Sequence, residues 1–131
     1  MKLLIIEDDV NLATTLARRF TKQGFTCELA HNSEQALQKL ATFEASHFLV
    51  DLKLGDDNGL ALIKPIRAQF PTARIVLLTG FASIASAVEA IRLGANDYLP
   101  KPVDFNALIR TILAACKDIS FRVGQADLAG V

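Results

Sequence analysis

Strand-like and helix-like stretches alternate five times between residues 1 and 118. Each strand-like stretch is a short apolar run, and a segment with apolar residues at every third or fourth position follows it. Connections between parallel strands of one sheet are right-handed, so this order predicts a parallel sheet with helices on both faces. Five such units make one domain, and we expect a single doubly wound α/β fold.

Local signals place the strands and the ends of the helices. The five strand-like runs are Lys2–Ile6, Phe25–Ala30, His47–Val50, Ala73–Leu78 and Asp97–Leu99. The first helix is expected to end at Gly24, because glycine readily takes the left-handed conformation that closes a helix. Ser33 is expected to cap the second helix through its hydroxyl group, and Asp9 and Asp104 to cap the first and last helices.

Apolar residues at helical spacing predict which side of each helix faces the core. The second helix is expected to pack through Ala36, Leu37, Leu40 and Ala41, and the third through Leu60, Ile63, Ile66 and Phe70. The fourth, Ala82–Leu93, is expected to point Ile84, Val88 and Ile91 inward, and the last, Asp104–Cys116, to pack through Leu108, Ile109, Ile112 and Leu113. Pro65 removes one backbone donor, so it is expected to kink the third helix or shift its start.

The composition limits the partners that this chain can have. Lysine plus arginine equals aspartate plus glutamate, 14 against 14, so there is no electrostatic footprint for nucleic acid or an anionic membrane. No apolar run approaches the roughly 20 residues of a membrane span, and the N-terminus does not resemble a signal peptide. We therefore expect a cytoplasmic protein with Cys27 and Cys116 as reduced structural thiols; a redox switch is the alternative.

Chemically reactive residues stand where the predicted strands end. In open α/β sheets, ligands bind beyond the carboxyl ends of the strands. The residues that fall there are Glu7, Asp8 and Asp9 after the first strand, Asp51 after the third, Thr79 after the fourth and Lys101 after the fifth. Adjacent carboxylates repel one another, and the repulsion grows as water is removed. The cluster therefore predicts that something positive binds among the acids.

Two positive groups are candidates for that role. Oxygen ligands without clustered histidine or cysteine suit Mg²⁺ and argue against zinc. Lys101 supplies a second positive charge from the end of the fifth strand. A carboxylate beside such a metal is able to attack phosphorus, while the metal and the lysine neutralise phosphoryl oxygens. The pocket therefore favours phosphoryl chemistry over the alternative, in which Asp51 caps a turn and Lys101 is a solvated surface residue.

Four stretches carry a resemblance to the receiver domain of two-component response regulators. They are "IIEDD", "FLVDLKLGDDNG", "IVLLTG" and "ANDYLPKP". The resemblance covers about residues 1–118 and implies a (βα)5 flavodoxin-like parallel sheet with strand order 2-1-3-4-5. It also implies a signalling switch: a sensor histidine kinase transfers a phosphoryl group to the domain, and the resulting change of conformation controls an output, here expected to be transcription.

The resemblance assigns roles in metal binding and phosphorylation. Asp51 matches the phosphoacceptor, which is also a metal ligand. Asp8 matches the direct ligand of Mg²⁺ or Mn²⁺, and Glu7 matches the acid that usually acts through water. Lys53 matches the position whose backbone carbonyl completes the metal shell.

Three further positions match the parts that sense and transmit phosphorylation. Thr79 matches the switch hydroxyl, Lys101 the phosphate-binding lysine, and Tyr98 the aromatic switch that moves inward on activation. The resemblance also implies a cis peptide bond between Lys101 and Pro102. We expect the output surface, and a homodimer, to use the face formed by the fourth helix, the fifth strand and the last helix.

The sequence departs from the common family pattern at one position and is most like one subfamily. Many receivers carry proline four residues after the phosphoacceptor, where this chain has Gly55. The forms "DLKLGDDNGL" and "LTGFASIASAVEAIRLGANDYL" most resemble the RegA/PrrA/ActR-type redox-responsive transcription regulators, which carry a C-terminal helix-turn-helix. Residues 119–131 show no clear period and are expected to be an extension or a truncated linker. The chain is then either a receiver cut from such a regulator or a stand-alone phosphorelay receiver.

Two other classes of protein remain to be weighed against this reading. Phosphatases of the haloacid dehalogenase type also combine an aspartate nucleophile with Mg²⁺, but they need a second aspartate two residues later, where this chain has Lys53. A pseudo-receiver that no longer takes phosphate would lack an acid, the threonine or the lysine, and none is missing here. We therefore expect self-phosphorylation with Mg²⁺, and at most slow self-dephosphorylation, rather than an enzyme that turns over a substrate.

Overall fold

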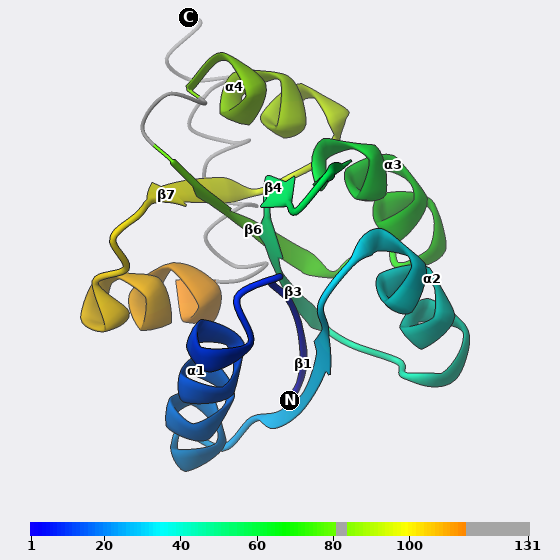
Figure 1. Ribbon diagram of the computed structural model, residues 1–131. Helices are drawn as coiled ribbons and strands as arrows, with labels where there is room; N and C mark the ends of the chain where they lie inside the picture. Colours follow the sequence, from blue (N-terminus) through cyan, green and yellow to red (C-terminus); the bar gives the residue numbers. More distant parts are fainter. Residues whose placement is uncertain (81–83, 115–131) are drawn as a thin grey trace, which may run out of the picture.

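Five parallel strands form one sheet at the centre of the computed structural model, which describes residues 1–80 and 84–114 (Figure 1). The strands are β1 (Lys2–Ile6), β2 (Thr26–Ala30), β3 (His47–Asp51), β6 (Arg74–Thr79) and β7 (Asp97–Pro100). Their order is β2-β1-β3-β6-β7. This confirms the predicted order 2-1-3-4-5, because the short strands β4 and β5 form a separate sheet and shift the numbering.

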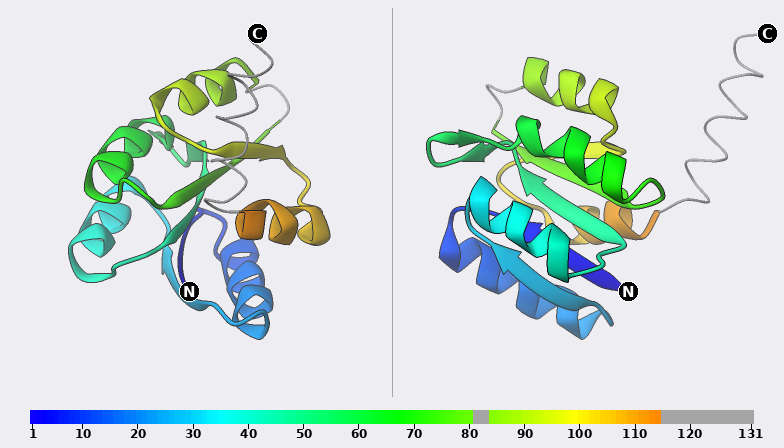
Figure 2. Two further views of the ribbon diagram at one scale, coloured as in Figure 1. Left: turned by 180° about the vertical axis from the view of Figure 1, so that it is seen from behind. Right: turned by 90° about the vertical axis from the view of Figure 1, so that its right-hand side faces the viewer.

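Helices cover both faces of the sheet, as the alternating pattern predicted (Figure 2). They are α1 (Val10–Lys22), α2 (Ser33–Thr42), α3 (Leu60–Gln69), α4 (Ile84–Leu93) and a last helix over residues 105–114. One core lies between the sheet and α2, α3 and α4, and a second lies between the sheet and α1 with the last helix. Leu3 packs into the second core and Leu4 into the first, which is why β1 is apolar at successive positions.

The helix ends are set by local hydrogen bonds and by glycine. Asp9 and Asp104 cap α1 and the last helix through their carboxylates, as predicted. Gly24 follows α1 with a φ of +96°, in the left-handed region that favours glycine. The predicted cap of α2 is wrong by one residue: the side chain of Asn32 accepts the capping bond at 2.8 Å, and Ser33 is the first helical residue. Asparagine and serine cap helices comparably well, so the residue type alone did not decide.

The inward face predicted for α4 is wrong. Val88 is 52% exposed and Ile91 37% exposed, whereas Ala87 and Ala90 are fully buried. The helix packs on α3 and β6 through these small residues, and Val88 and Ile91 are left on the outside. The predicted start at Ala82 and the side chain of Ile84 lie outside the residues that the structure describes.

The faces of α2 and the last helix were predicted in part. Leu40 and Leu108 are buried as expected, but Leu37 is 50% exposed and Leu113 is 43% exposed. Each of these two lies at the border of its helix's apolar stripe, next to a residue that is buried. Pro65 lies inside α3, which begins at Leu60 as the spacing predicted, so the proline does not shift the start of this helix.

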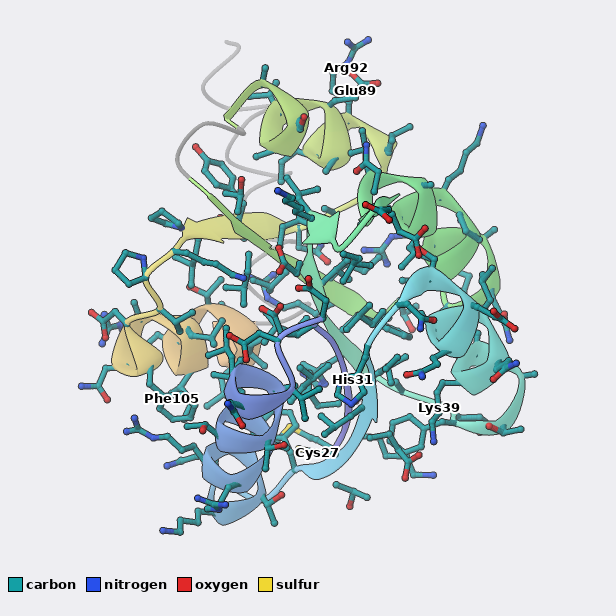
Figure 3. All side chains as sticks on the ribbon, in the orientation of Figure 1. Cys27, His31, Lys39, Glu89, Arg92 and Phe105 are labelled. Carbon is teal, nitrogen blue, oxygen red and sulfur yellow. The ribbon has the colours of Figure 1, made fainter. Side chains whose placement is uncertain are left out.

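Several sequence predictions fall outside the described residues. They concern Cys116, the domain boundary at residue 118 and the extension at 119–131. Cys27 lies on β2 beside α1 as a free, half-buried thiol, and burial raises its pKa (Figure 3). Within residues 1–80 and 84–114, no helix has the length and apolar character needed to span a bilayer.

A small antiparallel hairpin is the element that the sequence pattern did not predict. It consists of β4 (Lys53–Leu54) and β5 (Asp57–Asn58) and lies between β3 and α3. Its strands are two residues long and mostly polar, so neither apolar alternation nor an apolar run marks them. The hairpin stands at the carboxyl edge of the sheet and contacts the acidic residues described next.

Candidate functional site

Three carboxyl groups meet at the carboxyl edge of the sheet. Glu7 and Asp8 follow β1, and Asp51 ends β3, the strand that pairs with β1. Each contributes an oxygen atom to a group whose members all lie within 4.8 Å of one another. Glu7 is 1% exposed and Asp51 3% exposed, while Asp8 is open to solvent. The pairing of β1 with β3 therefore brings Asp51 next to acids that lie far from it in the sequence.

Lys101 reaches this cluster from the end of β7. Its Nζ donates a hydrogen bond to Asp51 Oδ2 at 2.8 Å and lies 2.9 Å from Glu7 Oε1. The backbone N–H of Lys101 donates to the carbonyl of Thr79 at 2.8 Å, and the peptide bond to Pro102 is cis, as the resemblance implied. The loop after β7 is thus held against β6 while its lysine side chain points to the acids.

Burial and mutual contact shift the ionisation of the cluster. Burial, with a hydrogen bond to Asp51, raises the pKa of Glu7 to about 8. The hydrogen bond to Glu7 lowers the pKa of Asp8. Burial opposes the charge on Lys101, but hydrogen bonds to Asp51 and Glu7 outweigh it and raise the pKa of the ammonium group. Without a metal, Glu7 therefore holds a proton at neutral pH, which relieves part of the repulsion among the acids.

The hairpin orients the backbone next to Asp51. The N–H of Lys53 donates to Asp51 Oδ1 at 3.1 Å, and the N–H of Gly59 donates to the carbonyl of Leu52 at 2.7 Å. Hydrogen-bonded and non-hydrogen-bonded pairs alternate along an antiparallel ladder, so Lys53 and Asn58 form a non-hydrogen-bonded pair. The carbonyl of Lys53 therefore faces the same side as its N–H, toward the acids, and is available as a metal ligand.

Two residues that shape the site were missed by sequence reasoning. A Cβ atom at Gly59 would lie 2.1 Å from the backbone oxygen of Asp51, so only glycine fits there. His31 follows β2 and places its Nδ1 3.0 Å from the backbone oxygen of Glu7, which fixes the end of β1 (Figure 3). The glycine in "DDNGL" was a visible signal for a close backbone approach, but His31 is isolated in the sequence and gave no signal.

The side chains of the predicted switch residues Thr79 and Tyr98 form no hydrogen bond with the acids in this conformation. Thr79 is 1% exposed at the end of β6, and its hydroxyl donates to the carbonyl of Gly80 at 2.9 Å. Tyr98 lies on β7 and is 37% exposed. The structure therefore brings Glu7, Asp8, Asp51 and Lys101 together and leaves the two switch side chains outside this cluster.

The donor set fits a hard divalent cation. Oxygen atoms of three acids converge, and Lys101 is the one ammonium group that pairs with them among the described residues. Mg²⁺ takes carboxylate, carbonyl and water oxygens in octahedral geometry. The exposed position of Asp8 leaves room for the waters that such an ion keeps.

Comparison with known proteins gives a consistent result. The family model described as "Response regulator receiver domain" matches residues 3–113. The chain is 40% identical over 112 residues to the photosynthetic apparatus regulatory protein RegA of Rhodobacter capsulatus, covering 86% of this chain and 61% of RegA. It is 39% identical over 111 residues to the acid tolerance regulatory protein ActR of Sinorhizobium medicae, covering 85% of this chain and 57% of ActR. The chain thus spans about three fifths of the length of these relatives.

Solved structures show the same fold. A response regulator protein from Burkholderia pseudomallei, with a phosphorylated aspartic acid, a calcium ion and citrate, matches with a TM-score of 0.82 and 36% identity over 99% of this chain and 75% of that chain. The receiver domain of NtrX from Brucella abortus matches with a TM-score of 0.77 and 28% identity over 86% of this chain and 99% of that chain.

Proposed function

This chain belongs to the response regulator receiver domain family, and we propose that it accepts a phosphoryl group on Asp51 from a sensor histidine kinase. The observation that carries the proposal is the position of Lys101. Its ammonium group lies 2.8 Å from Asp51 Oδ2 and 2.9 Å from Glu7 Oε1. A lysine that merely occupied the surface would not be held between two buried acids.

The transfer is a displacement at phosphorus. An oxygen of Asp51 forms the new P–O bond while the bond from phosphorus to the kinase histidine nitrogen breaks, and that nitrogen keeps the electron pair. Lys101 then pairs with a phosphoryl oxygen in place of the carboxylate oxygen that it contacts now. Asp8, Asp51 and the carbonyl of Lys53 would hold Mg²⁺ directly, with Glu7 acting through water. Bound Mg²⁺ would neutralise charge on the phosphoryl oxygens.

We infer that the domain is a stoichiometric acceptor, with slow self-dephosphorylation, rather than an enzyme that turns over a substrate. Asp8 is exposed, so the acid cluster is open to solvent on that side. A small donor such as acetyl phosphate is therefore expected to replace the kinase, with acetate as the leaving group.

Intact-mass spectrometry tests the proposal. The wild type, incubated with acetyl phosphate and Mg²⁺, is expected to gain the mass of one phosphoryl group, and Asp51→Asn is expected to gain none. Asp56→Asn is the matched control, because Asp56 is an exposed acid of the same hairpin and should leave labelling unchanged. Equal labelling of the wild type and Asp51→Asn would contradict the assignment.

We propose that Thr79 and Tyr98 transmit the effect of phosphorylation from the acid cluster to the surface. A phosphate on Asp51 would offer a new acceptor to the Thr79 hydroxyl, and movement of the loop after β6 toward it would vacate space for Tyr98. The face that changes is made by α4, β7 and the last helix, where large apolar side chains are exposed. We propose this face as the dimer and output surface. One relative, NtrC of Proteus hauseri, is a DNA-binding transcriptional regulator, and RegA and ActR are regulatory proteins; we propose a transcriptional output here.

A further inference from the structure

One contact of the hairpin differs from what the common family sequence allows. The backbone N–H of Gly55 donates a hydrogen bond to Asp8 Oδ2 at 3.0 Å. Position 55 is the one where many receivers carry proline, and proline has no N–H. The contact therefore depends on the residue that departs from the usual pattern.

Glycine is needed here for its backbone conformation rather than for its size. Gly55 has a φ of +61°, in the left-handed region that side chains disfavour, whereas a Cβ at this position would meet no atom within 4 Å. Proline is fixed near a φ of about −65° and would adopt a different turn. Gly55 thus contributes both the conformation of the hairpin tip and the donor that reaches Asp8.

The hairpin is anchored on both sides of this contact. On one side, the N–H of Lys53 donates to Asp51 Oδ1 at 3.1 Å. On the other, Asp57 Oδ2 accepts a hydrogen bond from the N–H of Ser33, at the start of α2, at 3.2 Å. The amide of Gly55 is therefore presented to Asp8 by a hairpin that is attached both to the acceptor aspartate and to α2.

We propose that the Gly55 N–H is a positioning group that restricts Asp8 to a single metal-ligating oxygen and thereby favours Mg²⁺ over Ca²⁺. Binding a cation through both carboxylate oxygens would compete with the hydrogen bond at Oδ2, whereas binding through Oδ1 alone keeps that bond. Ca²⁺ takes 6–8 oxygen ligands and often binds carboxylates through both oxygens, whereas Mg²⁺ accepts single oxygens in a strict octahedron. A carboxylate with one oxygen already hydrogen-bonded suits the smaller ion. This inference rests on the proposed function, because it assumes that the acid cluster binds a cation.

Isothermal titration of the whole chain with Mg²⁺ and, separately, with Ca²⁺ tests the inference. Gly55→Pro removes the donor and is expected to raise the Mg²⁺ Kd about tenfold, the lower end of the range for groups that orient metal ligands. The Ca²⁺ Kd is expected to change far less. The Ca²⁺ Kd divided by the Mg²⁺ Kd, which measures the preference for Mg²⁺, should therefore fall several-fold. Gly55→Asn is the conservative rescue, because asparagine keeps the N–H and tolerates a positive φ, and it should preserve the wild-type ratio.

Asp57→Ala controls for general loosening of the hairpin. It removes the anchor to Ser33 but leaves the Gly55 N–H in place, and it should leave the ratio of the two constants unchanged. If Gly55→Pro and Asp57→Ala weaken both ions in the same proportion, the selectivity role is refuted and only hairpin order matters. If the wild type binds neither ion, the proposed metal site itself is refuted, which is a different result.

A second pair of proteins keeps the test decisive if Gly55→Pro does not fold. The Gly55→Ala variant is made once with the normal amide and once with an ester at that position, by incorporating lactic acid. The two proteins share the side chain and differ in the N–H alone. A lower Mg²⁺-to-Ca²⁺ preference in the ester supports the inference, and equal preference in the two overturns it.

Discussion

The acid cluster and the α4–β7 face, the two ends of the proposed switch, are built differently. The acid cluster lies in a network of short contacts: Lys101 touches two acids, and backbone amides of the hairpin reach Asp51 and Asp8. The α4–β7 face instead presents apolar side chains to solvent, with Val88 52% and Tyr98 37% exposed. The proposed receiving end is thus held by hydrogen bonds without a phosphoryl group, whereas the proposed transmitting end keeps large apolar side chains exposed to solvent.

A similar contrast separates the segments after and before α4. After α4, the guanidinium of Arg67 donates to the carbonyl of Gly94 at 2.8 Å and to Asn96 Oδ1 at 2.9 Å. At the opposite edge of the sheet, the Thr79 hydroxyl is bonded to the adjacent Gly80 rather than to the acids. A preorganised site lowers the cost of binding, while a weakly committed hydroxyl is free to change partner. The following predictions test this division, starting with the largest expected effect.

Gly59→Ala should be the most damaging single change in the receiving end. The added Cβ would lie 2.1 Å from the backbone oxygen of Asp51, so the backbone of the hairpin or of β3 must move. Overpacking of this kind costs about 1–3 kcal/mol and sometimes more, and contact with rigid backbone places it at the upper end. Urea denaturation measures the loss in the free energy of unfolding.

Gly80→Ala is the matched control for that change. A Cβ at Gly80 would meet no atom within 4 Å, so the free energy of unfolding should change by less than about 0.5 kcal/mol. Equal effects of the two substitutions would mean that the region around Asp51 is no more tightly packed than the loop after β6, and the contrast drawn above would fail.

The same contrast explains how much the sequence predicted. The five strands and the acid cluster followed from apolar runs and from the rule that ligand sites lie at the carboxyl ends, and both were confirmed. Strands with long apolar runs, such as β3 and β6, have few alternatives to burial, so their position is determined locally. Glu7, Asp51 and Lys101 then meet because the sheet topology permits little else.

The features that were missed depend on contacts distant in sequence. The hairpin of Lys53–Leu54 and Asp57–Asn58 has no apolar pattern and is held by Asp8 and Ser33, which the local sequence does not reveal. The outward direction of Val88 depends on how closely α4 approaches α3, and the periodicity could not distinguish large residues facing in from small ones. Packing, rather than propensity, decided both.

The protonation of Glu7 should make the metal-free protein less stable as the pH rises. Its pKa is about 8 in the fold against an ordinary value of 4.5, so the folded state binds an extra proton between these values. Stability from this group is therefore complete below pH 4.5 and is lost as the pH rises to about 8. His47, whose pKa is lowered by burial, affects stability only below its ordinary pKa of 6.5. Thermal melts without Mg²⁺ between pH 6.5 and 8 should therefore report Glu7.

Glu7→Gln should abolish this pH dependence, because glutamine is neutral throughout. Mg²⁺ should act in the opposite direction, since a cation favours the ionised acid, and the apparent affinity for Mg²⁺ should rise with pH and level off near pH 8. A wild-type melting temperature that stays constant from pH 6.5 to 8, or one that varies equally in Glu7→Gln, would show that Glu7 is not the titrating group.

Mg²⁺ should stabilise the wild type by about 1.4 kcal/mol at roughly ten times its Kd, because it binds only the folded site. Asp8→Ala should weaken Mg²⁺ binding, and it should also lower the stability of the metal-free protein at neutral pH, because contacts with Glu7 and Gly55 lower the pKa of Asp8 and so favour its charged form in the fold. Melting with and without Mg²⁺ measures both effects in one experiment. Absence of a shift in the wild type would count against a metal site among these acids.

Val88→Ser should have the smallest effect on folding and a clear effect on assembly. Val88 is 52% exposed, so the monomer should lose less than about 0.5 kcal/mol, but the proposed dimer would lose apolar contact area. Leu37→Ser is the matched control, since Leu37 is 50% exposed on α2, which packs on β2 at the edge of the sheet opposite β7. Sedimentation velocity with beryllofluoride, a phosphoryl mimic, should show a dimer for the wild type and Leu37→Ser and a monomer for Val88→Ser.

The energetics give this last prediction its significance. Raising an active state from about 1% to about 99% requires about 5.5 kcal/mol of preference. One charge-assisted hydrogen bond from Thr79 supplies about 1.5–3 kcal/mol, so Lys101, the metal or the dimer itself must provide the rest. Dimer formation through the exposed apolar face is a source of that free energy which the receiving end does not contain. A wild type that remains monomeric at high micromolar concentration, with beryllofluoride shown to be bound, would place the whole preference in the acid cluster instead.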